Sequence, residues 1–331
     1  MRSEAALRGE GSLIEEIRAG RKALAGANLC GADLAGVNLA GVDLSGADLS
    51  GADLSGAILF QANLEGARLH GATLVGAELT AANLDNVDLE EADASQAGFG
   101  RATLRGAHLF QARLSGATFS MSDLGGADLR CAHLAGARLR EARLERADLT
   151  SADLRETDMA LCRVRGATFN NADLRDARLR QLNGFERASW IGADIRDVNF
   201  AGAYRLRRFV ADQNYIKEYR ESSPLHRLLY YIWWATSDCG RSMLRWCVLI
   251  LLQVLLFGAL FSLVQVDYGE HRTWLSPFYF SLVTLTSLGY GDVVPASAGG
   301  QILAMAEVVS GYIMLGGLIA IFSNRVARRA E

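Results

Sequence analysis

Large apolar residues recur at every fifth position over about half of the chain. From Leu24 to Leu179 these positions hold Leu, Phe, Met or Val, with Ala94 the one exception. The residue two places earlier is nearly always small, and a polar residue stands between the two. A period of five fits neither an α-helix nor a β-strand. It predicts a square coil with one corner per five residues, in which the large and the small residue of each side point inward.

The repeating motif Ala-(Asp/Asn)-Leu-x-Gly resembles that of the pentapeptide-repeat family, and the resemblance implies a right-handed quadrilateral β-helix over residues 24–203. With four repeats per coil, the rod has about eight coils and a length of about 40 Å at the usual strand spacing. After Leu179 the register slips by one, so that Phe185, Trp190, Ile195 and Phe200 become the centres. We interpret residues 180–183 as a bulged corner.

A rod of stacked coils leaves two open ends that must be covered. Residues 1–23 are expected to form an N-terminal cap, with a short helix at residues 13–17. Residues 204–240 are expected to hold a capping helix, at 205–220, and then a linker helix. Ser223 followed by Pro224 predicts the start of this second helix. Its Tyr and Trp residues, between 225 and 234, are typical of a helix that lies at a membrane interface.

Two apolar segments in the last part of the chain, at 243–266 and 300–322, are long enough to cross a bilayer. Arg241 and Arg245 precede the first span, whereas Arg325, Arg328 and Arg329 follow the second. The excess of positive charge at both flanks places both termini in the cytoplasm. We therefore expect residues 241–331 to be a multi-pass module in the inner (plasma) membrane of a bacterium.

Between these spans, residues 277–286 predict a short pore helix, and residues 287–292 read Ser-Leu-Gly-Tyr-Gly-Asp. Non-helical backbone at this depth is tolerated only where it lines a polar path. Successive backbone carbonyls from four chains can replace the water around a K⁺ ion. Turning these carbonyls to one axis requires alternating left-handed residues, a conformation that Gly289 and Gly291 adopt without a Cβ penalty.

This module, from Met243 to Arg329, resembles the two-transmembrane, one-pore-loop potassium channels. The resemblance implies a homotetramer whose filter binds K⁺ through Ser287, Leu288, Gly289, Tyr290 and Gly291. It also implies a gating hinge in the inner helix at Gly311, with Gly316 as a second small position. Ser287 stands where the family usually has Thr, and Leu288 where it has Val or Ile, so the degree of selectivity stays open.

Several further residues are predicted to act around the filter. Asp292, Tyr279 and Thr286 are expected to support it. Leu315, Ile319 and Ser323, spaced four apart, share one helix face and are expected to line the inner cavity and gate. Glu307 is an ionisable group within the second span, where such groups are costly. Either it takes part in gating through a hydrogen bond to Ser281 or Thr284, or it serves packing alone.

Charge and cysteine content exclude other classes of function. The net charge of −3 argues against a nucleic-acid partner. Acidic residues dominate positions 24–100, whereas arginines outnumber them at 101–180. Such a basic half suits the anionic inner leaflet or the acidic half of a neighbouring subunit, and a merely solvated surface is equally open. The cysteines lack the spacing of a disulfide framework or a zinc site. His70, His108 and His133 are interpreted as surface residues.

The fold class that follows is multi-domain: an N-terminal β-helix of pentapeptide repeats, then a C-terminal all-α two-transmembrane pore module with a re-entrant pore helix. The predicted function is passive K⁺ conduction through a tetrameric pore in the lipid bilayer. The repeat domain is given a regulatory or assembly role, with an unidentified cytoplasmic ligand or protein. No enzyme activity, no cofactor and no metal other than K⁺ are expected. A non-selective cation channel and a membrane-anchored scaffold whose repeats bind a partner are the alternatives.

Overall fold

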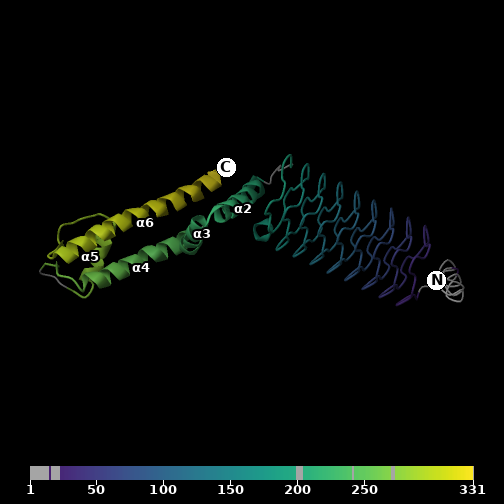
Figure 1. The fold of residues 1–331 in the computed structure, drawn as a ribbon, viewed down its shortest axis with the longest axis horizontal. Helices are drawn as coiled ribbons and strands as arrows, with labels where there is room; N and C mark the ends of the chain where they lie inside the picture. The colour runs from purple at the N-terminus through teal and green to yellow at the C-terminus, as the bar shows by residue number, and fades with distance from the viewer. Residues whose placement is uncertain (1–14, 16–22, 199–203, 241, 270–272, 331) are drawn as a thin grey trace. The chain divides into compact units, whose positions relative to one another are not determined.

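The computed structural model divides the chain into two compact units, Met1–Lys217 and Glu218–Glu331. It describes residues 15, 23–198, 204–240, 242–269 and 273–330, with side chains up to Ser323. The first unit is a stack of coils and the second is a set of helices (Figure 1). Each unit is described by itself below. The predicted N-terminal helix at 13–17 and the predicted centre Phe200 lie outside the described residues, apart from Glu15.

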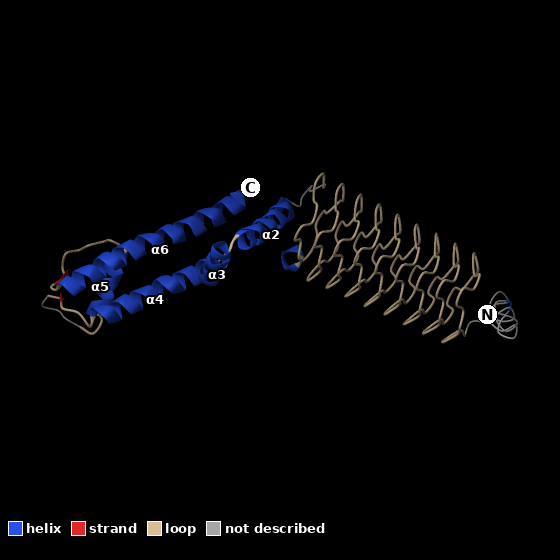
Figure 2. Ribbon diagram, viewed as in Figure 1, coloured by secondary structure: helices blue, strands red, loops and turns tan. Residues whose placement is uncertain are grey.

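The first unit is a β-helix in which each coil pairs in parallel with the next. Single-residue bridges join positions twenty apart, from Ala23 and Asp43 at one end of the stack to Arg163 and Asn183. Hydrogen bonds run between coils on both sides of each bridge, as from Leu49 N to the Arg68 carbonyl (2.7 Å). Because each pairing is one residue long, Figure 2 draws these coils as loops rather than strands. The predicted β-helix is confirmed.

The core of the rod consists of the fifth-position residues and their small partners. From Leu34 to Leu179 these large side chains are at most 1% exposed, and Ala47, two before Leu49, is fully buried. Residues twenty apart stack directly on one another. The rings of Phe99 and Phe119, for example, lie 4.7 Å apart between centroids and are parallel within 1°. Burial of this continuous column is what stabilises coils that have no helix or wide sheet of their own.

The polar residue beside each centre closes the turn that follows. Asp48 Oδ1, for example, accepts a hydrogen bond from the Ser50 backbone N–H (3.1 Å). The next residue, Gly51, has a φ of 65°, in the left-handed region where a glycine carries no Cβ penalty. Asp or Asn before the centre and Gly after it therefore have separate roles: one satisfies a backbone donor and the other turns the chain.

In the second half of the rod, several turns carry an additional ion pair. An Asp before the centre and an Arg after it form a two-pronged contact, as in Asp194 with Arg196, where Nη2 lies 2.6 Å from Oδ2. Hydrogen bonding from Arg196 lowers the pKa of Asp194 to about 2. The same contact lowers the pKa of three other carboxyls, those of Asp128, Asp153 and Asp173.

The register slip lies slightly later than predicted. The twenty-residue spacing persists through Asn183, and the next bridge joins Thr168 to Ser189, twenty-one residues on. The extra residue sits in a corner around the 3₁₀ turn η1, Phe185–Arg187, which begins after Gly184 at φ 80°. Residues 180–183 are thus regular, and the interpretation of a bulge there was wrong. Pairing of Asn183 with the preceding coil fixes it in place, so the extra residue is accommodated after it.

Helix α2, Tyr204–Ser222, closes the end of the rod. Leu206 and Val210 are each 1% exposed and belong to the rod core. Gln213 Oε1 accepts from the Trp190 backbone N–H (2.9 Å), and its Nε2 donates to the Ala188 carbonyl (3.1 Å). The last coil would otherwise present unpaired backbone groups, and α2 supplies side-chain partners for them.

In its described residues, the second unit contains the end of α2, four further helices and one small ribbon. Helix α3 spans Pro224–Ser237, with Ser223 as its N-cap and Pro224 at its first turn, as the sequence indicates. Helices α4, Met243–Phe261, and α6, Ala298–Ala330, are connected through α5, Ser276–Leu285. By length and composition, Met243–Phe261 and Ala298–Ser323 suit membrane spans. The two-residue strands β1, Val266–Asp267, and β2, Val294–Pro295, pair antiparallel.

These bounds differ from the expected ones at the outer end of the module. The first span was predicted to reach residue 266, but α4 ends at Phe261, whose carbonyl accepts from the Tyr268 hydroxyl (3.1 Å). Val266 instead pairs with Pro295 in the ribbon. The apolar run continues past the helix because the ribbon also needs apolar residues, so hydropathy does not mark the helix end.

Replacing Phe119 by Ala should destabilise the rod strongly, because it removes one ring of the Phe99–Phe119 stack and leaves a cavity. The expected loss is about 3–5 kcal/mol of unfolding free energy. Urea unfolding followed by circular dichroism measures it. Phe60→Ala is the matched control: Phe60 is 42% exposed, and its loss should cost no more than about 0.5 kcal/mol. Equal losses in the two variants would contradict the stacked core.

The rod should lose stability in acid. The folded-state pKa of Asp194 lies below the ordinary aspartate value of 3.8, so its contribution to stability is present above that value and is lost as the pH falls from about 4 to about 2. Urea unfolding at each pH measures this. Arg196→Gln should reduce the pH dependence, whereas Arg180→Gln, at a side chain with no ion pair among the described residues, should not. An unchanged dependence in Arg196→Gln would rule out the pair as its source.

Candidate pore and filter

The segment that contains the pore helix α5 begins and ends at the same end of the module. The β1–β2 ribbon pairs the segment that follows α4 with the segment that precedes α6, so the chain between the two strands turns back on itself. Helix α5 packs against both α4 and α6. It is ten residues long, too short to cross a bilayer. Its inward residues Phe280, Val283 and Leu285 are buried, which leaves its C-terminal end to present the loop that follows.

The loop after α5 has left-handed backbone at alternate residues. Ser287, Gly289 and Gly291 have φ values of 56°, 52° and 76°. Leu288 and Tyr290, between them, are not among the residues with positive φ. Such alternation turns successive carbonyl groups to the same side of the chain, the arrangement by which a filter replaces the hydration of a cation. The two glycines were predicted for this conformation, but Ser287 was not.

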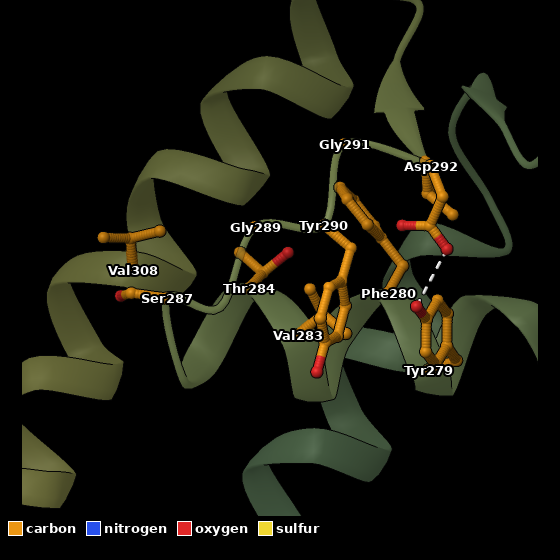
Figure 3. Close-up of a pocket in the computed structure, with 11 residues that line it drawn as sticks. Tyr279, Phe280, Val283, Thr284, Ser287, Gly289, Tyr290, Gly291, Asp292 and Val308 are labelled. Atoms are coloured by element: carbon orange, nitrogen blue, oxygen red, sulfur yellow. Dashed lines mark hydrogen bonds between the residues drawn. The ribbon is translucent and has the colours of Figure 1, made fainter.

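Two sets of hydrogen bonds tie the loop to α5. At its start, the Ser287 and Leu288 backbone N–H groups donate to the Thr284 and Val283 carbonyls, both at 3.1 Å. At its end, the Tyr279 hydroxyl donates to Asp292 Oδ2 (2.8 Å), the contact dashed in Figure 3. The loop is thus held at both ends by one helix, and the left-handed residues lie between the two anchors.

The other predicted filter residues are placed as follows. The Thr286 hydroxyl donates to the Leu282 carbonyl (2.7 Å) within α5 and makes no hydrogen bond to the loop beyond it among the described residues. The Tyr290 ring, 67% exposed in the single chain, extends toward α5 (Figure 3). Leu288 is 58% exposed. Both side chains are therefore largely uncovered within the single chain.

The inner helix α6 meets the end of α5 at Gly311. A Cβ on Gly311 would lie 2.5 Å from the Leu285 carbonyl oxygen, so no other residue fits at this contact. Gly316 has nothing within 4 Å of its Cβ position. The next residue, Gly317, is the close-packed one, since its Cβ would lie 2.3 Å from the Trp246 ring of α4. Sequence reasoning missed Gly317 because two adjacent glycines give no signal of which faces a neighbour.

The predicted cavity residues lie further along α6. Ile319 is 68% exposed and Ser323 is exposed, whereas Leu315 is half-buried. Glu307, one turn before Gly311, is fully buried and is hydrogen-bonded to the Ser281 hydroxyl of α5. Of the two partners considered for Glu307 from the sequence, the structure therefore selects Ser281.

A cluster on the rod was also missed. His70, Asp88 and Glu90 offer ligand atoms that all lie within 4.8 Å of one another, although the three side chains are partly or fully exposed. The sequence separates His70 from the other two by eighteen and twenty residues. The coil repeat brings them onto adjacent turns, which linear spacing alone does not indicate.

Two family models match the chain in separate segments. The model described as ion channel matches residues 249–328. The model described as pentapeptide repeats matches in eight copies, over residues 24–61, 62–99, 95–130, 127–166 and 142–181. The chain is a pentapeptide-repeat domain joined to an ion-channel domain. The ion-channel domain includes most of α4, all of α5 and the loop at 287–292, and nearly all of α6.

Two curated relatives match the ion-channel domain. The ion-channel domain is similar to the calcium-gated potassium channel TvoK of Thermoplasma volcanium, 39% identical over 72 residues, or 20% of this chain and 21% of that protein. It is also similar to two-pore potassium channel 1 of Arabidopsis thaliana, 35% identical over 91 residues, or 27% and 25%. The chain thus spans about a fifth to a quarter of the length of these relatives.

For the repeat domain, a similar solved structure is HetL, a pentapeptide repeat protein involved in heterocyst differentiation regulation from the cyanobacterium Nostoc. It is 31% identical, and the match covers 56% of this chain and 96% of that one with a TM-score of 0.28.

Removing the Tyr279 hydroxyl should loosen the end of the filter loop. Tyr279→Phe deletes the hydrogen bond to Asp292, and a bond to a charged group contributes about 1.5–3 kcal/mol. We expect the K⁺-over-Na⁺ flux ratio of proteoliposomes to fall about tenfold. Tyr312→Phe, at an exposed tyrosine of α6, is the control and should leave the ratio unchanged. A normal ratio in Tyr279→Phe would show that the loop does not depend on this anchor.

Proposed function

We propose that the chain is one subunit of a potassium channel, in which four copies surround a central pore. The observation that carries the proposal is the alternating left-handed backbone at Ser287, Gly289 and Gly291, in a loop that re-enters between two helices long enough to span a membrane. In four copies, Ser287 to Gly291 line the axis with oxygen atoms that replace the water around K⁺. Oligomerisation is required because one loop supplies only part of each oxygen cage.

Exposed apolar side chains support an assembly in a bilayer. On α4, Leu244, Leu252 and Leu256 are all more than half exposed, and so are Ile302 and Val309 on α6. In the tetramer, lipid and neighbouring subunits cover these faces. Leu315, Ile319 and Ser323 line the inner cavity, and Gly311, held against α5, is where the inner helix pivots. Gly316, which meets no neighbour in the single chain, faces the cavity side.

The arginines that flank the two spans support an orientation with both termini in the cytoplasm, across the inner membrane of a bacterium. Helix α3 lies in this membrane's cytoplasmic interface. Its Leu228, Tyr231 and Trp234 are exposed in the single chain. The Arg245 guanidinium lies 5.8 Å from the Trp234 ring centroid, which suits an aromatic residue at the headgroup level. The repeat domain is then cytoplasmic, where it regulates the pore or directs its assembly.

Reconstituted protein should carry K⁺ in preference to Na⁺ in a liposome flux assay. Gly291→Ala should reduce K⁺ flux at least about tenfold, because left-handed backbone costs a residue with a Cβ about 1–2 kcal/mol in every subunit. Gly299→Ala is the control, because Gly299 lies outside the left-handed region and its Cβ would come no closer than 3.9 Å to a neighbouring atom.

Equal K⁺ and Na⁺ flux would instead indicate a non-selective cation channel, and no flux would favour a scaffold. The same assay on a chain that lacks residues 1–203 tests the repeat domain. A change in flux or assembly indicates that it regulates the pore, and identical behaviour overturns that role.

A further inference from the structure

Glu307 is a carboxyl group enclosed between three helices. It lies on α6 in a segment otherwise apolar enough to span a membrane, and it is fully buried within the single chain. Its Oε1 is hydrogen-bonded to the Ser281 hydroxyl of α5, whereas its Oε2 is buried and has no hydrogen-bond partner among the described residues. The same Ser281 Oγ lies 3.1 Å from the Val254 carbonyl oxygen of α4. One hydroxyl therefore contacts two acceptor groups.

The number of protons available determines how these groups are bonded. Ser281 has a single hydroxyl proton, and a backbone carbonyl has none to give. If Ser281 donates to Val254, the contact between Ser281 and Glu307 needs a proton from the carboxyl. Glu307 in its neutral form supplies it. The remaining oxygen, Oε2, is then an uncharged carbonyl oxygen, the polar group whose lack of a partner is least costly.

The charged form has no comparable support. The other titratable side chains described on the three helices are Arg245 and Cys247 of α4, Tyr279 of α5 and Tyr312 of α6. Arg245 contacts Trp234 and Asp238, and Tyr279 donates to Asp292. Cys247 and Tyr312 are exposed. No ion pair to Glu307 is formed within the described residues, and a buried carboxylate without a cation costs several kcal/mol.

We propose that Glu307 is a neutral carboxylic acid that donates its proton to Ser281, which in turn donates to the Val254 carbonyl. These two hydrogen bonds connect α6, α5 and α4. Glu307 is thereby a positioning residue. It fixes α5, which carries the filter loop, against α6 one turn before the Gly311 contact. The positioning role rests on the proposed channel function, but the protonation state does not.

Neighbouring contacts show that this side of α6 is fastened to the rest of the module by polar groups. Gln253 of α4 donates to the Ser310 hydroxyl (2.7 Å), which donates to the Glu307 carbonyl (2.9 Å). One turn further, Trp246 Nε1 donates to the Met314 carbonyl (2.7 Å). Positions 307, 310 and 314 lie on one helix face. In a bilayer such contacts meet little competition from water. The hydrogen bonds between Glu307, Ser281 and Val254 are therefore one of several sets that hold the helices in register.

Infrared spectroscopy of the full-length protein in lipid tests the protonation state. Glu307 is the only fully buried carboxyl group among the described residues, so the carbonyl band of a protonated carboxylic acid at neutral pH should come from it. The band should be absent in Glu307→Gln and shifted in Ser281→Ala, which removes its acceptor. Absence of the band from the wild-type protein, or its persistence in Glu307→Gln, would overturn the assignment. This measurement requires no ion flux, so it separates a failure of this inference from a failure of the proposed channel function.

Flux measurements test the positioning role. Glu307→Gln keeps a neutral group that donates to Ser281, and K⁺ flux should stay within about twofold of wild type. Glu307→Leu removes the hydrogen bond to Ser281, and flux or K⁺ selectivity should fall about tenfold. Ser281→Ala should cause the same fall, and it serves as the test if the Leu variant does not fold. Gln301→Leu, at an exposed position of the same helix, is the matched control. Wild-type behaviour of both Glu307→Leu and Ser281→Ala would overturn the positioning role.

The pH profile separates this role from simple packing. Wild-type and Glu307→Gln channels should have the same acid-side profile, because the carboxyl is already protonated there. On the alkaline side, ionisation of Glu307 removes the proton that it donates to Ser281. The flux of the wild-type channel should then fall below that of Glu307→Gln. A divergence on the acid side instead would show that Glu307 is charged at neutral pH and would contradict the proposal.

Discussion

Left-handed backbone at fixed intervals is the constraint on which both domains depend. In the rod, one left-handed residue after each core residue turns the chain through a corner, so that four sides close into a coil. In the filter loop the interval is two rather than five, and successive carbonyls face the same way instead of turning a corner. The same local conformation therefore yields a closed coil or an ion path, according to its spacing.

The left-handed corners of the rod differ in the residue type that occupies them. The first corners, from Gly26 to Gly56, are all glycines, whereas many later corners carry side chains, such as Met121 and Leu161. Those residues sit in a conformation that is costly for a Cβ. The stacked core and the hydrogen bonds of the adjacent coils hold them there. Glycine is therefore not required at every corner, and the five-residue period persists where the motif departs from Ala-(Asp/Asn)-Leu-x-Gly.

Sequence reasoning predicted the features that a single residue type dictates. The core positions and the glycines of the filter belong to this class, because burial and positive φ restrict the choice of residue. It did not predict Ser287 in the left-handed region, since Ser adopts that conformation only under constraint from Thr284 and Val283. Nor did it predict that His70 lies close to Glu90, or that Gly317 rather than Gly316 packs closely against a neighbouring helix. Those features depend on which segments become neighbours, and a linear pattern carries no such information.

The pore domain relies on polar groups where its composition is most apolar. Tyr279 with Asp292 fixes the end of the filter loop, and Glu307 with Ser281 fixes the helix behind it. Apolar packing alone gives helices in lipid little preference between neighbouring positions, because lipid tails are as apolar as Leu. Hydrogen bonds have defined directions and so select one arrangement. The two contacts lie on one helix, α5, which is therefore hydrogen-bonded both to the end of the filter loop and to α6.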